Sequence, residues 1–303
     1  MLIFPGNKFQ FMERREFIKS LPLAAGIPLF LRNRTVRNFW LQDDDATLCN
    51  RKFQFAATNN LKTQPIGQVV IEMGKSFLGT DYAANTLEQP GPEHLVINLR
   101  GLDCVTFCEN SLALARCIKQ DQTTFDQFKA SLQLIRYRGG IINGYPSRLH
   151  YFSDAIYDGV KKGIYEDVTE KIGGVPYQKK INFMSTHPDD YPKLKENPEF
   201  ISRLKEQEEA INRRNLFHIP KDKIDHTGEQ IHSGDILAIT TAIEGIDVSH
   251  TGMALWQDGK LHFMHAPNVG YKVQITSGTL SEYLASHSKQ LGIMVARPVE
   301  IKP

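Results

Sequence analysis

The chain has 303 residues, of which 41% are hydrophobic and 23% are charged. This is enough apolar material for one sizeable core, and no internal repeat or second block of distinct composition indicates two independent domains. The formal net charge is only +2 at pH 7, so nothing in the composition requires a nucleic-acid or strongly anionic partner, and we expect no nucleic-acid partner.

Residues 1–34 carry the pattern of an export signal. Arg14 and Arg15 precede a short apolar run over residues 21–31, an arrangement typical of twin-arginine signals. The run is too short to span a bilayer, so we expect export to the periplasm and no stable membrane span. The polar residues 35–62 predict a linker or an N-terminal arm that lies over the domain. The rest of the chain, to residue 303, is then a single domain.

Cys104 stands at the predicted start of an amphipathic helix. Val105, Cys108 and Leu112 recur at three- and four-residue steps, which is the period of a buried helix face. The unpaired N–H groups and the positive dipole end at a helix start favour a thiolate, the form of cysteine that attacks carbonyls. Position alone also allows the alternative that Cys104 is one more small, buried apolar residue.

Further helices are predicted on both sides of the cysteine helix, over residues 66–77 and 125–135. Residues 141–231 then form a stretch longer than a simple connection requires, and we expect this insertion to build walls of a substrate cleft. Within it, Asn197 and Pro198 predict the cap and first residue of a charged surface helix.

Asp258 and Gly259, between two apolar runs, predict a β-hairpin with a two-residue type I′ turn. Such a turn fixes the register, and it places His250 and His265 on one face of the sheet and His262 on the other. Two histidines on one face, in a chain with a cysteine at a helix start, favour a catalytic interpretation over a structural one.

Strands are also predicted over residues 234–240, 271–275 and 291–297. Helices first and an antiparallel sheet afterwards give an α+β fold, in which the cysteine helix packs on the sheet. We expect that packing to bring Cys104 to His250.

The expected site is a catalytic triad. Cys104 is the nucleophile, His250 is the base, and His265 orients the base and fixes its tautomer. Zinc binding by His262 and His265 is not expected, because three-residue spacing on a strand points the rings to opposite faces. Asp103 would either hold a substrate amine or favour the helix start electrostatically.

These features resemble the papain-like cysteine hydrolases of the NlpC superfamily, which cut bacterial peptidoglycan, and within it the N-acetylmuramoyl-L-alanine amidase-like branch. The resemblance covers residues 65–298, most of the chain. The segments that carry it are residues 74–82, 103–104, 147–151, 182–188 and 249–252.

The resemblance implies a papain-like, NlpC-type core and the triad Cys104, His250 and His265. It also implies that Tyr82 lies beside the nucleophile, where its hydroxyl helps to polarise the substrate carbonyl. Many endopeptidases of the superfamily carry Asp-Cys-Ser-Gly, and their serine helps to hold the free amine of a stem peptide. Val105 occupies that position here, which weakens an endopeptidase assignment.

We therefore expect an exported, monomeric cysteine amidase that cleaves the N-acetylmuramoyl-L-alanine bond of muropeptides through an acyl-enzyme, with no metal and no cofactor. Arg148 and His150, in a predicted exposed loop, would help to position the muropeptide. Three alternatives are an endopeptidase that cuts the γ-D-glutamyl bond of the stem peptide, a non-catalytic wall-binding module, and a zinc hydrolase.

Overall fold

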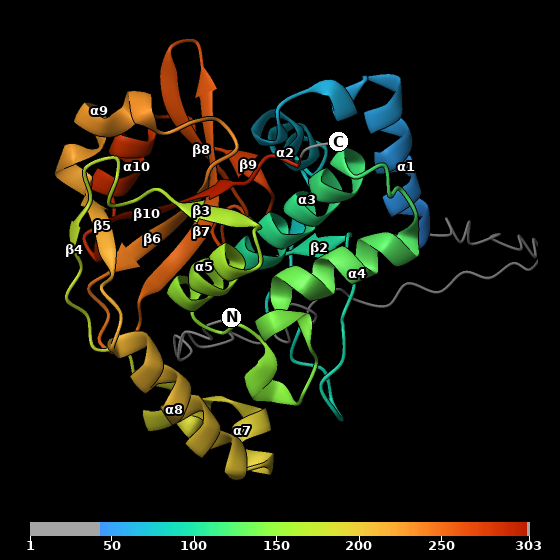
Figure 1. Ribbon diagram of the computed structural model, residues 1–303. Coiled ribbons are helices and arrows are strands. Elements are labelled where there is room, and N and C mark those ends of the chain that lie inside the picture. The colour runs from blue at the N-terminus through green and yellow to red at the C-terminus, as the bar shows by residue number, and fades with distance from the viewer. Residues whose placement is uncertain (1–42, 302–303) are drawn as a thin grey trace, which may run out of the picture.

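The computed structural model describes residues 43–301, so the export-like pattern of residues 1–34 lies outside the described part of the chain. Figure 1 shows a group of helices from the first half of the chain beside a twisted sheet from the second half. The helices are α1 (Asp45–Thr58), α2 (Ile66–Lys75), α3 (Cys104–Lys119), α4 (Phe125–Arg136), α5 (Phe152–Lys161), α6 (Phe183–Thr186), α7 (Pro192–Glu196), α8 (Glu199–Asn212), α9 (Ile224–Thr227) and α10 (Leu280–Ala285).

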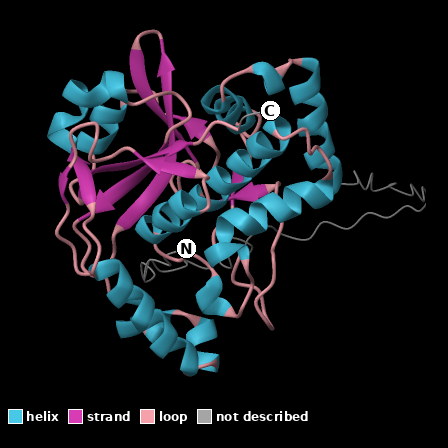
Figure 2. Cartoon of the chain, viewed as in Figure 1, coloured by secondary structure: helices cyan, strands magenta, loops and turns pink. Residues whose placement is uncertain are grey.

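The main sheet has eight strands in the order β4-β5-β10-β6-β7-β8-β9, with β3 also paired to β10, and all its pairs are antiparallel (Figure 2). A second, parallel pair joins β1 and β2. The α+β expectation with an antiparallel sheet is therefore confirmed. The strands are β1 (Asp81–Tyr82), β2 (Gly101–Leu102), β3 (Tyr165–Asp167), β4 (Val175–Pro176), β5 (Phe217–Pro220), β6 (Ile236–Thr241), β7 (Val248–Gln257), β8 (Lys260–His265), β9 (Gln274–Ile275) and β10 (Gln290–Pro298).

The sheet is covered on both faces. Along β6, Ile236 and Ala238 belong to the core beneath α1–α4, whereas Leu237 and Ile239 belong to a second core that includes buried residues of α9 and α10. Successive residues of a strand point to opposite faces, so a strand with two buried faces needs a continuous apolar run rather than an alternating one. Among residues 43–301, no helix is long and apolar enough to cross a bilayer.

The start of α3 is fixed by a capping box. The Oδ1 atom of Asp103 accepts hydrogen bonds from the backbone N–H groups of Val105 and Thr106, at 3.0 and 2.8 Å. In return, the Thr106 hydroxyl oxygen accepts a bond from the Asp103 N–H at 2.9 Å. Such caps stabilise a helix by about 1 kcal/mol, and this one holds Cys104 at the first helical position.

The β7–β8 hairpin has the predicted register. Both residues of its turn, 258–259, have positive φ angles of 50° and 71°, as a type I′ turn requires. The strands pair Gly252 with His265 and Leu255 with His262. The hairpin prediction is confirmed, and with it the side of the sheet on which each histidine lies.

Of the two alternatives predicted for residues 35–62, a linker and an N-terminal arm over the domain, α1 does not fit the linker, because it is a helix packed on the domain. Asp44 caps this helix by accepting a bond from the backbone N–H of Thr47 at 2.7 Å. Its residues Cys49, Phe53 and Ala56 are buried in the main core. The composition of the segment is polar because only a narrow stripe of α1 faces the core, and this stripe is easily overlooked in sequence.

The insertion over residues 141–231 forms part of the main sheet. Its strands β3 and β5 both pair with β10, so it completes the edge of the main sheet. The helix predicted after Asn197 begins one residue later than expected, with Pro198 as its N-cap and without a side-chain capping bond. Leu204 and Ile211 on this helix are buried, so its role is not only that of a solvated surface helix.

The strand predicted over residues 271–275 is shorter than expected, since β9 contains only Gln274 and Ile275. Tyr271 has a φ angle of 55°. This left-handed conformation is incompatible with a regular strand, and it bends the chain before the pairing with β8 begins.

Candidate active site

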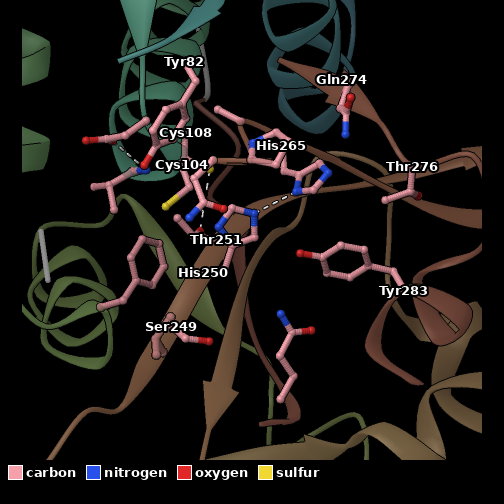
Figure 3. A pocket seen from close by; sticks show the side chains of 18 of the residues that line it. Tyr82, Cys104, Cys108, Ser249, His250, Thr251, His265, Gln274, Thr276 and Tyr283 are labelled. Carbon is pink, nitrogen blue, oxygen red and sulfur yellow. Dashed lines mark hydrogen bonds between the residues drawn. The ribbon is translucent and has the colours of Figure 1, made fainter. Parts of the chain in front are cut away.

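A cavity of about 660 Å³ lies where the start of α3 meets the β7–β8 hairpin and α10. Cys104, His250 and His265 all line it. Figure 3 shows the three side chains gathered in one space, although they come from three different elements. The predicted packing of the cysteine helix against the histidine strands therefore occurs.

Cys104 is partly exposed to the cavity. Burial raises the pKa of its thiol to about 12, and the charge of Asp103 acts in the same direction. The backbone N–H groups of Thr251 and of Cys104 itself act in the opposite direction, but more weakly. The expected thiolate at the helix start is therefore wrong for the resting site, because burial outweighs the favourable helix start.

His250 and His265 form a close pair, with 2.7 Å between Nε2 of His250 and Nδ1 of His265. Burial lowers the pKa of His250 well below its usual value, and charges on His265 and His287 add to this effect. Burial, followed by the charge of His287, lowers the pKa of His265 to about 4. Both rings are neutral at pH 7, so one nitrogen of the pair donates and the other accepts.

The pairing restricts which nitrogen of His250 can act as a base. Its Nε2 atom is paired with His265, so Nδ1 is the nitrogen that can accept a proton from a group in the cavity. A neutral imidazole has one N–H and one bare nitrogen, so Nδ1 can accept a proton only when Nε2 carries the hydrogen and donates to His265. His265 then carries its own hydrogen on Nε2. In this tautomer His265 can orient the His250 ring and stabilise its protonated form.

His262 takes no part in this arrangement. Its Nδ1 atom lies 3.1 Å from the backbone carbonyl oxygen of Thr276, and the residue does not line the cavity. Within residues 43–301, no group of three or more histidine, cysteine, aspartate or glutamate side chains is arranged to hold a metal ion.

Tyr82 and Asp103 both line the cavity beside Cys104. Burial raises the pKa of Tyr82, and charges on Cys104 and Asp103 raise it further, so its hydroxyl stays protonated and can donate. Asp103 is only 2% exposed. Its Oδ1 atom caps α3, whereas its Oδ2 atom is buried without a hydrogen-bond partner among the described residues.

His150 also lines the cavity, but it is not in an exposed loop as expected. Its side chain is buried, and its Nε2 atom lies 2.9 Å from the backbone carbonyl oxygen of Tyr145. Because a carbonyl only accepts, Nε2 must carry the hydrogen and Nδ1 must be an acceptor. That Nδ1 atom has no partner within residues 43–301.

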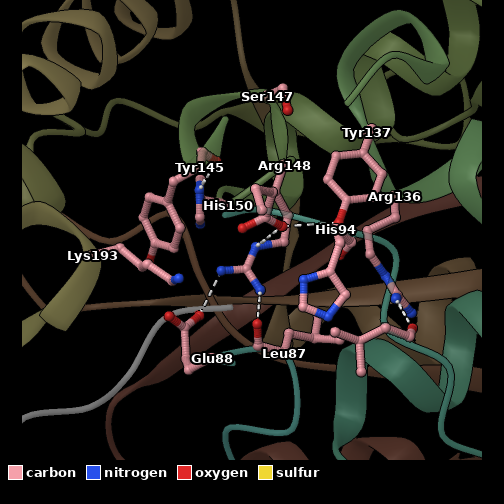
Figure 4. A network of polar contacts seen from close by, with 12 residues as sticks. Leu87, Glu88, His94, Arg136, Tyr137, Tyr145, Ser147, Arg148, His150 and Lys193 are labelled. Atoms are coloured by element: carbon pink, nitrogen blue, oxygen red, sulfur yellow. Dashed lines mark hydrogen bonds and ion pairs between the residues drawn. The ribbon is translucent and has the colours of Figure 1, made fainter. Parts of the chain in front are cut away.

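Arg148 lies outside the cavity lining, in the buried polar network of Figure 4. Its guanidinium donates to the backbone oxygen of Leu87 at 2.9 Å and to the carboxylate of Glu88 at 2.6 Å. A second carboxylate, that of Glu93, lies 3.6 Å from its Nε atom. The expectation that Arg148 contacts substrate from an exposed loop is wrong, because its guanidinium is buried and already paired with these partners. Arg148 instead ties residues 87–93 to the domain.

The cavity has two unlike walls. Apolar side chains from α4, α5 and their surroundings form one wall, and polar side chains from β9, α10 and the start of β10 form the other. Sequence reasoning missed the polar wall, since α10 carries no motif. The apolar wall contains Ile135, Leu149, Phe152, Ala155 and Tyr165, and the polar wall contains Gln274, Thr276, Glu282, Tyr283 and Gln290.

Comparison with known proteins identifies the family. A family model described as AmiA-like, N-acetylmuramoyl-L-alanine amidase-like, matches residues 72–293. The chain belongs to this family. The match contains every residue of the proposed triad and both walls of the cavity. The AmiA-like family is one of amidase-like peptidoglycan hydrolases.

Solved structures agree with the AmiA-like assignment. A structure named N-acetylmuramoyl-L-alanine amidase, from Bacteroides uniformis, is 38% identical, covers 78% of this chain and 99% of its own, and has a TM-score of 0.74. A Bacteroides fragilis protein provisionally named a xylanase is 40% identical over 75% of this chain and 99% of its own, with a TM-score of 0.71. A Legionella pneumophila protein shares the fold at 22% identity, covering 85% of this chain and 95% of its own, with a TM-score of 0.65. No curated protein matches the chain.

Proposed function

We propose that this AmiA-like protein is a cysteine amidase that hydrolyses the bond between N-acetylmuramic acid and L-alanine in muropeptides, on a papain-like core of the NlpC type. The name of the Bacteroides uniformis relative supports the choice of bond. The observation that carries the mechanism is the bond between His250 and His265 in the cavity that Cys104 enters. This pair leaves one ring nitrogen of His250 free to serve the thiol.

In the acylation step, the Sγ atom of Cys104 attacks the lactyl carbonyl carbon, and its proton passes to Nδ1 of His250. The negative charge that develops on the carbonyl oxygen is stabilised by the hydroxyl of Tyr82 and by the backbone N–H of Cys104, which the Asp103 cap leaves unused. His250 then protonates the alanine nitrogen, the C–N bond breaks, and the peptide leaves with its amine free. The muramyl lactyl group stays on Cys104 as a thioester.

In the deacylation step, His250 takes a proton from water, and the resulting hydroxide attacks the thioester carbonyl. Collapse of this second intermediate returns the proton from His250 to sulfur and releases the lactyl carboxylic acid, which ionises in water. His265 accepts the Nε2–H of His250 throughout, so it stabilises the imidazolium that forms in both steps. Because the resting thiol and imidazoles are neutral, proton transfer accompanies attack rather than preceding it.

The alternative within this class is a stem-peptide endopeptidase. The unpaired Oδ2 atom of Asp103 favours it, since a buried carboxylate oxygen beside the nucleophile suits a free amine. Val105 stands where many related endopeptidases have the serine that helps to hold the free amine, and this difference favours the amidase. The two enzymes differ in the bond that they cut, so product analysis separates them.

The test is to incubate a disaccharide-tetrapeptide with the protein and to identify both products by mass spectrometry. Free disaccharide and intact tetrapeptide are expected, whereas a sugar-linked dipeptide would establish the endopeptidase. Cys104→Ala should remove all turnover while the fold persists. Cys117→Ala is the matched control, because Cys117 lies on the same helix but outside the cavity lining. Full activity of the Cys104 variant would end the cysteine mechanism.

We further propose export to the periplasm through the twin-arginine pattern at Arg14 and Arg15. Receptors of this pathway recognise the guanidinium pair rather than charge alone. Replacing both residues by lysine should therefore retain the protein in the cytoplasm. Unchanged fractionation of that variant would reject the twin-arginine interpretation.

A further inference from the structure

Helix α10 holds one side chain of the polar wall in a fixed position. A capping box closes its start, in which the Thr279 N–H donates to the Glu282 carboxylate at 2.8 Å and the Glu282 N–H donates to the Thr279 hydroxyl at 3.2 Å. Leu280 and Leu284 anchor the helix in the second core. Tyr283 lies between these two leucines in sequence; its ring also packs against this core, and its side chain lines the cavity.

Three aromatic rings surround the ring of Tyr283. The ring centroids of Phe263, His265 and His287 lie 5.3, 5.2 and 4.6 Å from its own. This packing explains the aromatic ring, because offset and edge contacts of this kind stabilise aromatic clusters. It does not explain the hydroxyl, since a phenylalanine would make the same ring contacts.

The hydroxyl of Tyr283 is directed into the cavity, toward the side where His250 lies (Figure 3). Burial raises the pKa of Tyr283, the neighbouring Gln290 side chain acts in the opposite direction, and a charge on Cys104 would raise the pKa further. The hydroxyl is therefore a neutral donor close to the nucleophile. The Gln290 side chain is hydrogen-bonded to this hydroxyl. Because the contact lowers the pKa of Tyr283, the amide N–H of Gln290 donates to the hydroxyl oxygen, which leaves the hydroxyl hydrogen available to a substrate.

Gln290, at the start of β10, supplies an unused acceptor on the same wall. Its side chain is 8% exposed and lines the cavity. Its Oε1 atom is buried without a partner among the described residues. Buried polar atoms are almost always paired in native proteins, so one that borders a cavity requires an explanation.

We propose that Tyr283 and Gln290 form a subsite for a secondary amide of the substrate, next to the bond that is cut. The Tyr283 hydroxyl donates to the amide carbonyl oxygen, and Oε1 of Gln290 accepts from the amide N–H. One neutral donor beside one neutral acceptor matches the two polar atoms of a –CO–NH– group. A charged carboxylate or amine would leave one of the two unpaired.

The proposal rests on the proposed function, because a muropeptide carries secondary amides in two places. One is the acetamido group of each sugar, and the other is the peptide backbone of the stem. Both present the same –CO–NH– chemistry to Tyr283 and Gln290. Substrates that lack one or the other amide distinguish these sources.

The experiment compares wild type, Tyr283→Phe, Gln290→Leu and the double variant on three substrates. These are the disaccharide-tetrapeptide, its de-N-acetylated form, and the disaccharide linked to L-alanine alone. On the first, each single variant should lose roughly tenfold in kcat/KM, as expected for one neutral hydrogen bond. The loss should disappear on the de-N-acetylated substrate if the acetamido group is bound, or on the L-alanine substrate if a stem amide is bound.

The double variant should lose little more than either single variant, because both residues bind one group. Tyr157→Phe is the matched control, since Tyr157 is 40% exposed on α5 and lies outside the cavity lining. An equal loss on all three substrates would overturn the subsite, because it would place the hydroxyl on the scissile bond itself. No loss on any substrate would also overturn it.

A binding measurement separates this proposal from the proposed function. Titration calorimetry with the disaccharide-tetrapeptide in a Cys104→Ala background needs no turnover. There, Tyr283→Phe should weaken binding roughly tenfold, and unchanged affinity would reject the subsite. If the wild type fails to cleave the disaccharide-tetrapeptide, the amidase proposal is rejected. The effect of Tyr283→Phe on affinity still tests the subsite, because the binding measurement needs no turnover.

Discussion

The high pKa of Cys104 predicts how its alkylation by iodoacetamide depends on pH. Burial moves this pKa from an ordinary 9.0 to about 12. At any pH well below 9 the thiolate fraction is then about a thousandfold lower than that of an ordinary thiol, which corresponds to about 4 kcal/mol. Only the thiolate reacts with the reagent. Alkylation of Cys104 should therefore be slow at neutral pH and should rise about tenfold per pH unit, without a plateau below pH 10.

The assay measures the rate at each cysteine by peptide mass spectrometry between pH 5 and pH 10. Cys49, Cys108 and Cys117 are fully buried and should react more slowly than Cys104 at every pH. His250→Ala should leave the slope for Cys104 unchanged, because burial raises the pKa of the thiol and lowers that of His250, and both shifts favour the neutral forms. A rate plateau near neutral pH that disappears in His250→Ala would refute the reasoning, since it would reveal a resting thiolate–imidazolium pair.

The remaining predictions concern the base, acid stability and the buried ion pair. His265→Gln should keep more activity than His265→Ala, because an amide can still accept the Nε2–H of His250; greater damage from His262→Ala, at unchanged stability, would contradict this assignment. The pKa of His265 falls from an ordinary 6.5 to about 4 on folding, so the unfolded chain takes up the proton first and stability falls as pH drops from 6.5 to 4. The loss should be about 3 kcal/mol from this residue in urea titrations, and a smaller pH dependence in His265→Gln is expected. Arg148→Met should lower the free energy of unfolding by about 3–5 kcal/mol, because it leaves buried carboxylates unpaired. Arg100 is the exposed control, since its guanidinium pairs with Asp45 at the surface, at 3.3 Å. Arg100→Met should cost less than about 1 kcal/mol, and equal losses in the two variants would contradict a larger contribution from the buried pair.

The sequence by itself determined the features that depend on neighbouring residues. Asp103 before Cys104 indicated a helix start, and the chain forms a capping box there. Turn residues 258–259 set the hairpin register, and the register selected His265 over His262 as the partner of His250. These inferences succeeded because helix caps and two-residue turns involve only a few consecutive residues, whose chemistry restricts the backbone directly.

Only the tertiary structure decided the features that depend on burial and on distant partners. The neutral thiol of Cys104 results from surrounding segments that exclude water from it, and no local pattern encodes that effect. The partners of Arg148 come from residues 87–93, far away in sequence, so a buried ion pair was mistaken for an exposed ligand. Tyr283 enters the site because α10 packs against the histidine face of the sheet. Desolvation and charge pairing are properties of the assembled core, and they become defined only when elements distant in sequence meet.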